Sequence, residues 1–287
     1  MKCTVLSVLV GVTAVAAAPR DYSSLEARQL GIVANDVKDG NCKPVTFIMA
    51  RGSTETSNMG TIVGPPTCAA LKANLGADQV ACQGIGTEDG YAAGLAPNFQ
   101  PKNTDAQSIK AALDIMDLTM SKCPDTTVVM GGYSQGSAVI DNAIQAMPAA
   151  QQAKVAGVVV WGFTRAAQDN RQIPGYPAAQ TKVFCAPGDL VCNNTLTITA
   201  AHLSYGVNAP ESGAFLAQMA KKAMASGGAA AGAAAGGAAG AAAGGAAGGA
   251  AGAAAGGAAG AAGGAAGGAA GGAAPGFGGL FGGLFGK

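Results

Sequence analysis

A serine between two glycines lies near the middle of the chain, in Gly132-Tyr133-Ser134-Gln135-Gly136. The apolar residues 128–130 before it favour a buried strand, and apolar residues recur at helical spacing over 138–147. Strand, G-x-S-x-G and helix in this order are typical of a nucleophile elbow, a tight turn that exposes the serine hydroxyl above a sheet edge. The helix N-terminus there favours a developing negative charge. The segment therefore predicts a nucleophilic serine, although G-x-S-x-G can also be a plain turn in a glycine-rich chain.

A nucleophilic serine needs a base and a group that orients the base. The chain contains one histidine, His202, so no other imidazole can activate Ser134. Asp189 lies between the two, and Ser, Asp, His is the chain order of α/β hydrolases. A lone histidine is more often an ordinary residue, and an aspartate after Gly188 is also typical of a turn. Together the three side chains predict a triad of Ser134, His202 and Asp189.

Strands and helices alternate along the chain in a way that could position this triad. Apolar segments favour strands at 44–50, 80–85, 128–133, 155–163 and 182–185, and helical periodicity favours helices at 61–75, 105–122, 135–147 and 210–225. This alternation predicts an α/β fold with a mostly parallel central sheet and helices on both faces. In such a sheet the loop 51–56 after the first strand would lie at the carboxyl edge, where open α/β sheets bind ligands.

Composition divides the chain into four segments. Residues 1–18 have the early lysine, apolar centre and small-residue end of a secretory signal peptide, so we expect a secreted, extracellular protein. Residues 19–30 are either a pro-segment or the frayed N-terminus of the mature protein. Residues 31–225 suit one α/β domain with an ample core. Residues 226–287 are almost entirely glycine and alanine, and we expect a largely disordered low-complexity tail.

The remaining composition restricts partners and cofactors. Of the seven cysteines, Cys3 lies in the expected signal peptide, which leaves six. An even count in a secreted protein favours three disulfides over metal ligation, and without a C-x-x-C pattern we expect neither a metal nor another cofactor. A net charge of +1 gives no reason to expect nucleic acid. We also expect a monomer without stable membrane insertion.

Four motifs in register resemble those of the fungal cutinases, small lidless serine esterases. They are Ala50-Arg51-Gly52-Ser53-Thr54-Glu55-Thr56, the elbow at 131–136, the segment 183–192 around Asp189, and Ala201-His202-Leu203. The resemblance covers about residues 30–225. It implies a small lidless α/β-hydrolase fold, with Ser134 as nucleophile, His202 as general base and then acid, and Asp189 as the residue that orients it.

Further roles are implied by the resemblance alone. The oxyanion hole would consist of the backbone N–H groups of Ser53 and Gln135, and Asn98 resembles an asparagine that steadies the serine of that hole. The family resemblance also implies disulfides, with Cys68–Cys82 resembling a bridge found in some members; the pairs would be Cys42–Cys123, Cys68–Cys82 and Cys185–Cys192.

The expected substrate is cutin, or another aliphatic polyester or lipid ester. Leu95, Leu196 and Ile198 fall where the family has lipid-contacting residues, and Phe99 either joins them or packs into the core. An acetylxylan esterase on the same fold is the alternative enzyme, and a non-catalytic wall protein with a functional tail is the alternative of another class. Asn193-Asn194-Thr195 is an N-glycosylation sequon that could place a glycan at the mouth of the site.

Overall fold

A computed structural model of the chain describes residues 30–241. Our interpretation of residues 1–18 as a signal peptide and of 19–29 as a pro-segment lies outside the described residues, as does the tail from 242 onward.

The centre of the fold is a five-stranded sheet in the order β2-β1-β3-β4-β5, with every neighbouring pair parallel. The strands are β1 (Val45–Ala50), β2 (Val80–Gly84), β3 (Thr127–Tyr133), β4 (Val155–Trp161) and β5 (Thr181–Phe184). The last residues of β1, β3, β4 and β5 lie side by side in register. The loops that follow these strands therefore meet at one edge of the sheet. The predicted fold class, a small α/β hydrolase with a parallel sheet, is confirmed.

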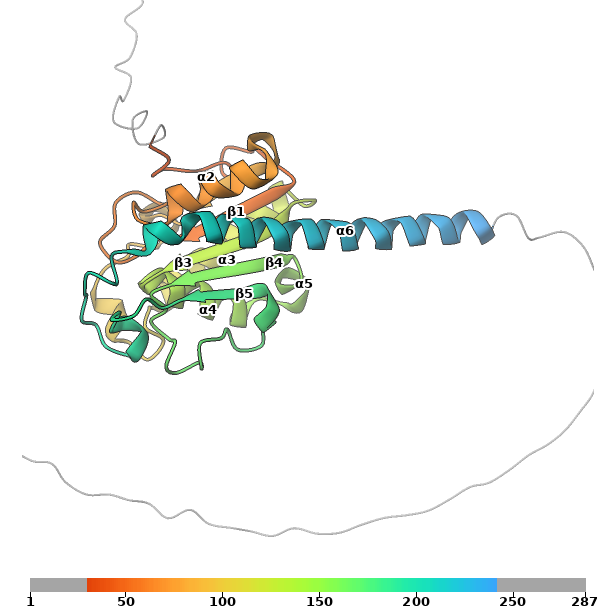
Figure 1. Cartoon of the computed structure of the whole chain (residues 1–287). Helices are drawn as coiled ribbons and strands as arrows, with labels where there is room; N and C mark the ends of the chain where they lie inside the picture. The colour runs from red at the N-terminus through yellow and green to blue at the C-terminus, as the bar shows by residue number, and fades with distance from the viewer. Residues whose placement is uncertain (1–29, 242–287) are drawn as a thin grey trace, which may run out of the picture. The chain divides into compact units, whose positions relative to one another are not determined.

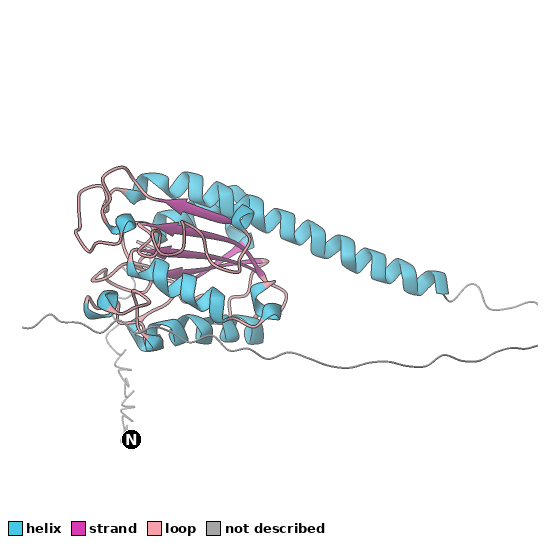
Figure 2. Cartoon of the chain, turned by 90° about the horizontal axis from the view of Figure 1, so that it is seen from below, coloured by secondary structure: helices cyan, strands magenta, loops and turns pink. Residues whose placement is uncertain are grey.

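Helices cover both faces of the sheet (Figures 1 and 2). The α-helices are α2 (Gly64–Leu75), α3 (Ala106–Lys122), α4 (Gln135–Ala146), α5 (Ala149–Gln152) and α6 (Ala209–Ala241). Short 3-10 helices are η1 (Ala77–Gln79), η2 (Thr87–Asp89), η3 (Ala96–Phe99), η4 (Ala178–Gln180), η5 (Val191–Asn193) and η6 (Tyr205–Asn208). Apart from the end of α6, the predicted boundaries lie within a few residues of these. The start of α3 is set by a cap, because the Asp105 side chain accepts a hydrogen bond from Ser108 N at 2.7 Å.

Two apolar cores lie on opposite faces of the sheet because successive strand residues point to opposite sides. Ile48 of β1 joins the core under α3 and α4, and Phe47 joins the core under α2 and α6. The strands read as continuous apolar runs because both of their faces are buried. This double burial makes the carboxyl edge of the sheet a rigid platform for the loops above it.

The three disulfides that the resemblance implied are present. Cys42–Cys123 joins the segment before β1 to the end of α3, and Cys68–Cys82 joins α2 to β2. Cys185–Cys192 closes the loop after β5, with a sequence separation of 7. Constraint of the unfolded chain grows with loop length, so this last bridge matters more for the position of the enclosed loop than for chain entropy.

The closing helix is longer than the sequence predicted. We expected it to end at residue 225 and the tail to be largely disordered from 226, but α6 continues to Ala241. The correction has a simple reason: runs of alanine, the strongest helix former, outweigh the glycines that interrupt them here. No helix within residues 30–241 is both long enough and apolar enough to cross a membrane.

Candidate active site

Ser134 occupies a strained turn between β3 and α4. Its φ and ψ are 52° and −121°, outside the region that side chains ordinarily tolerate. The flanking glycines are required by space: a Cβ on Gly132 would lie 2.4 Å from the carbonyl oxygen of Gly136, and one on Gly136 would lie 2.1 Å from that of Ala50. The segment therefore has the geometry of a nucleophile elbow, as its sequence predicted.

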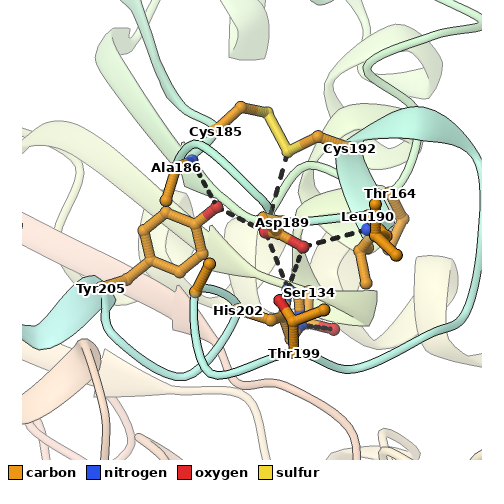
Figure 3. A network of polar contacts seen from close by, with 12 residues as sticks. Ser134, Thr164, Cys185, Ala186, Asp189, Leu190, Cys192, Thr199, His202 and Tyr205 are labelled. Carbon is orange, nitrogen blue, oxygen red and sulfur yellow. Dashed lines mark hydrogen bonds and ion pairs between the residues drawn. A yellow bond between two sulfur atoms is a disulfide. The ribbon is translucent and has the colours of Figure 1, made fainter.

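The structure brings the three predicted side chains together (Figure 3). His202 Nε2 lies 2.9 Å from Ser134 Oγ, and His202 Nδ1 lies 2.9 and 3.0 Å from the two carboxylate oxygens of Asp189. With the ring proton on Nδ1, where the carboxylate accepts it, Nε2 can accept the serine proton. Ser134 follows β3, whereas Asp189 and His202 both lie in the segment between β5 and α6, and all three are buried or nearly so.

Asp189 is held by further donors that the sequence did not reveal (Figure 3). Its two carboxylate oxygens accept from Val191 N at 3.0 Å and from the hydroxyl of Tyr205. That hydroxyl in turn accepts from Ala186 N at 2.9 Å. Burial, and the hydrogen bond to Asp189, raise the pKa of Tyr205 above its ordinary value, so its hydroxyl keeps the proton that it donates. Tyr205 therefore links the Asp189 carboxylate to the backbone of the disulfide-closed loop.

The imidazole is confined on two sides. The ring of Tyr133 stacks on it with centroids 5.3 Å apart, and the Tyr133 hydroxyl donates to the carbonyl oxygen of His202 at 2.8 Å. The backbone of Gly162 also approaches the ring so closely that a Cβ there would lie 2.6 Å from His202 Cε1. Tyr133 occupies one of the two unspecified positions of the G-x-S-x-G motif, so the motif gives no indication of this role.

The two predicted oxyanion donors belong to different segments, Ser53 to the loop after β1 and Gln135 to the start of α4. The Ser134 N–H is already bound to the carbonyl oxygen of Trp161 at 2.9 Å, so it is not free to bind an oxyanion. Gln135 begins α4, and its side chain donates to Gly94 O at 2.7 Å. Ser53 lies in the loop after β1, where Asn98 Nδ2 donates to its hydroxyl at 2.9 Å. The expected steadying contact of Asn98 is thus present.

A buried arginine anchors the loop that carries Ser53. Arg51 is only 4% exposed, and its guanidinium donates to the carbonyl oxygens of Glu55 at 2.9 Å, Ile85 at 3.0 Å and Ala92 at 3.3 Å. Among the described residues no carboxylate lies within ion-pair distance of it. The ring of Tyr91 lies 5.3 Å from the guanidinium carbon. Arg51 belongs to the motif at 50–56, but its anchoring role was not predicted from sequence.

Glu55 completes this anchoring from inside the loop. Its carboxylate accepts from Gly52 N at 2.7 Å, Thr61 N at 2.8 Å and Ile62 N at 2.9 Å. A carboxylate that binds three backbone donors fixes the loop without an ion pair. The backbone beside Ser53 is therefore held by the guanidinium of Arg51 and by the carboxylate of Glu55, and both groups are hydrogen-bonded to main-chain atoms.

An open pocket of about 570 Å³ lies over Ser134 and His202. The predicted substrate residues Leu95, Leu196 and Ile198 line it and are 62, 38 and 54% exposed. Phe99, for which the sequence left two placements open, is exposed to 78% and also lines the pocket. Asn98 also lines the pocket but is buried, and its side chain donates hydrogen bonds to the Ser53 hydroxyl and to the carbonyl oxygen of Leu95. The mouth is thus apolar and its floor is polar.

Comparison with known proteins agrees with this geometry. The family model described as Cutinase matches residues 41–220. A probable cutinase 3 of Neosartorya fischeri is 61% identical over 193 residues, which cover 67% of this chain and 88% of the relative. Cutinase 3 of Emericella nidulans is 58% identical over 194 residues, 68% of this chain and 86% of the relative. Among solved structures, a Trichoderma reesei cutinase in complex with a phosphonate inhibitor superposes with a TM-score of 0.58 at 29% identity, covering 70% of this chain and 86% of that one.

Proposed function

Because the chain belongs to the cutinase family and is a carboxylic ester hydrolase, we propose that it cleaves the ester bonds of cutin and of short-to-medium-chain acyl esters through an acyl-enzyme on Ser134. The observation that carries this proposal is the unbroken hydrogen-bonded chain from Ser134 Oγ through the His202 ring to Asp189. Disulfides in the described domain support secretion into an oxidising, extracellular compartment. We infer that the enzyme acts as a monomer.

The reaction follows from the positions of these groups. Ser134 Oγ attacks the ester carbonyl carbon while His202 Nε2 takes its proton, and the protonated ring then gives that proton to the leaving alcohol. Water, deprotonated by the same nitrogen, hydrolyses the acyl-enzyme and releases the acid. Asp189 keeps the ring oriented and stabilises its charged form.

The backbone N–H groups of Ser53 and Gln135 would bind the negative oxygen of each tetrahedral intermediate. One such donor typically contributes about 2.7–4 kcal/mol of transition-state stabilisation. The anchoring of the Ser53 loop supports this role, because a donor stabilises charge best when it needs no reorganisation.

The exposed apolar side chains around the mouth support an acyl-lipid or polyester substrate. Leu95, Leu196 and Ile198 present carbon surface beside the serine, where an acyl chain leaving Ser134 would lie. An acetylxylan esterase has only an acetyl group to hold and would gain little from these side chains. Rates on p-nitrophenyl acetate, butyrate and octanoate distinguish the two functions, and activity confined to acetate would contradict ours.

The decisive experiment measures release of soluble monomers from cutin by the purified protein and by its Ser134→Ala variant. We expect release by the wild type only. A phosphonate ester should also label the wild type once per molecule and should leave the variant unlabelled. Equal activity of the two proteins would revive the non-catalytic alternative, in which the described domain is not the functional part.

A further inference from the structure

A second cavity of about 420 Å³ adjoins the mouth of the active-site pocket. Asn98, Phe99 and Leu196 line both cavities and form the lip between them. The second cavity extends away from Ser134 between the segments 98–103, 164–168 and 194–196. We call it the amide groove, after the side chains that line it.

The lining of the amide groove is polar but uncharged. Five carboxamides and two hydroxyls contribute to it, and none of the described residues that line it is charged: Asn98, Gln100, Asn103, Gln168, Asn194, Thr164 and Thr195. Carboxamides offer both donors and acceptors, which suits neutral groups such as hydroxyls. A bare alkyl chain would leave them unpaired, and an ion would meet no opposite charge. The groove therefore differs in chemistry from the apolar mouth beside it.

Some of these groups are already fixed in place. Gln168 Nε2 donates to Asn194 Oδ1 at 2.5 Å and to Asn103 Oδ1 at 3.4 Å, which connects the two sides of the groove. Asn103 and Asn194 hold φ values of 54° and 64°, a backbone region that asparagine tolerates better than most residues. Neither the carboxamide of Gln100 nor Asn194 Nδ2 makes a hydrogen bond to any described residue. A preordered carboxamide with a spare donor, such as that of Asn194, is suited to bind a ligand at low entropic cost.

Phe99 stands at the junction, with 78% of its surface exposed. Its ring gives the carbon skeleton of a ligand an apolar face where the groove meets the pocket. An ester seated at Ser134 would thus have carbon surface on one side and carboxamides beyond the lip. From this arrangement, and resting on the proposed function, we propose that the amide groove binds a hydroxyl-bearing part of the ester substrate and favours esters that carry such a group.

The test compares kcat/KM for 1-monobutyrin, whose alcohol part carries two hydroxyls, with that for ethyl butyrate. It uses the full-length protein and its Gln100→Leu and Gln168→Leu variants, all treated with an endoglycosidase so that a glycan at Asn193 cannot cover the groove. Both glutamines are exposed and neither lines the active-site pocket, so the folded domain should tolerate each change. Gln79→Leu, an exposed glutamine in η1, is the matched control.

We expect the ratio of monobutyrin to ethyl butyrate kcat/KM to fall about threefold to tenfold in the groove variants, the effect of one or two net hydrogen bonds. The ratio should not change in Gln79→Leu. Intrinsic differences in leaving-group reactivity cancel, because only the change of the ratio between proteins is compared. The carboxamide of Gln100 makes no hydrogen bond to a described residue, so the Gln100→Leu variant remains interpretable even if Gln168→Leu disturbs the loop at 194–196.

Equal ratios in wild type, Gln100→Leu and Gln168→Leu would overturn the groove proposal. So would a loss of activity on both esters by the same factor in both variants. Absence of Ser134-dependent hydrolysis of either ester by the wild type would instead contradict the proposed function. The two failures are therefore distinguishable in one data set.

Discussion

Two aspartates of this protein are almost completely buried, yet their surroundings differ in kind. Asp189 receives hydrogen bonds from His202, Tyr205 and Val191 N, none of which is permanently charged. Asp141, on the helix that follows the elbow, shares the guanidinium of Arg165 with a second carboxylate: Arg165 Nε lies 3.0 Å from Asp141 and 2.6 Å from Asp169. Burial alone therefore does not indicate function. What distinguishes the two is whether the partners direct the carboxylate at a reacting group.

Replacement of each aspartate by asparagine is the sharpest test of this contrast. In Asp189→Asn the carboxamide can present its NH2 group to His202 Nδ1 and favour the wrong ring tautomer. We expect kcat on p-nitrophenyl butyrate to fall by about 10⁴, as for the equivalent change in a serine protease. Stopped-flow assays measure kcat of the wild type, overnight assays measure kcat of the variant, and circular dichroism checks that the fold is intact. A loss below tenfold with the fold preserved would remove Asp189 from the triad.

Arg51, a buried cation close to the site, differs from Arg165 because its guanidinium donates to carbonyl oxygens rather than to carboxylates. Arg51→Met should loosen the loop that carries Ser53 and lower kcat by about 10–100-fold, up to the effect of one oxyanion donor. KM should change little, since ground-state binding depends on the apolar mouth.

Arg51→Lys retains the charge but cannot reproduce the planar set of donors. If the lysine variant restores full kcat, charge alone supports the site and the anchoring hydrogen bonds are dispensable. If the methionine variant changes KM and leaves kcat intact, the loop does not act through the transition state.

A substitution at Tyr205 tests whether a hydrogen bond from outside the triad helps to hold the Asp189 carboxylate. Tyr205→Phe removes one donor to the carboxylate and keeps the aromatic packing. We expect kcat to fall about tenfold, near the value of one hydrogen bond to a charged group, with KM unchanged. Tyr176→Phe is a matched control, because its buried hydroxyl donates to Val155 O at a distance from the site. A similar loss of kcat in both variants would show that the effect is one of stability.

The sequence could predict the residues that react but only some of those that hold them. Ser134 and His202 were found because a motif marks one and the other has no competitor in the chain. Chain order then indicated Asp189. Tyr205 and Arg51 carry no such signal, since a tyrosine or arginine reaches its partners only after distant strands have come together. Strand alternation likewise predicted the parallel sheet, whereas the extension of α6 depended on a fine balance between alanine and glycine.

Asp141 could not have been identified from the sequence for a related reason. It looks like an ordinary polar position of a helix, yet its side chain is fully buried and lies against Arg165. One guanidinium cannot compensate two ionised carboxylates in that space. Burial first, and then the nearby Asp169, raise the pKa of Asp141 to about 7, although Arg165 acts in the opposite direction.

The sign of the pH effect follows from this shift. The folded protein keeps a proton on Asp141 at pH values where the unfolded chain, with an ordinary carboxyl pKa of about 3.9, has lost it. The free energy of unfolding therefore decreases as pH rises from about 4 to about 7 and then levels off. Asp141→Asn mimics the protonated form and should not show this decrease. Relative to wild type, the variant should thus gain about 3 kcal/mol between pH 4.5 and pH 8, measured as the difference in unfolding free energy from urea titrations.

The Asp141→Asn substitution should leave activity intact, in contrast to Asp189→Asn. At pH 8 we expect kcat of Asp141→Asn to lie within about twofold of wild type, because neither Arg165 nor Asp169 lines the pocket over Ser134. Asp169→Asn is the control for the shared guanidinium: with one carboxylate removed, Asp141 can ionise beside Arg165 and the pH dependence of stability should shrink. A constant stability difference between wild type and Asp141→Asn over the whole pH range would mean that Asp141 is ionised in the folded protein and that Arg165 alone compensates both charges.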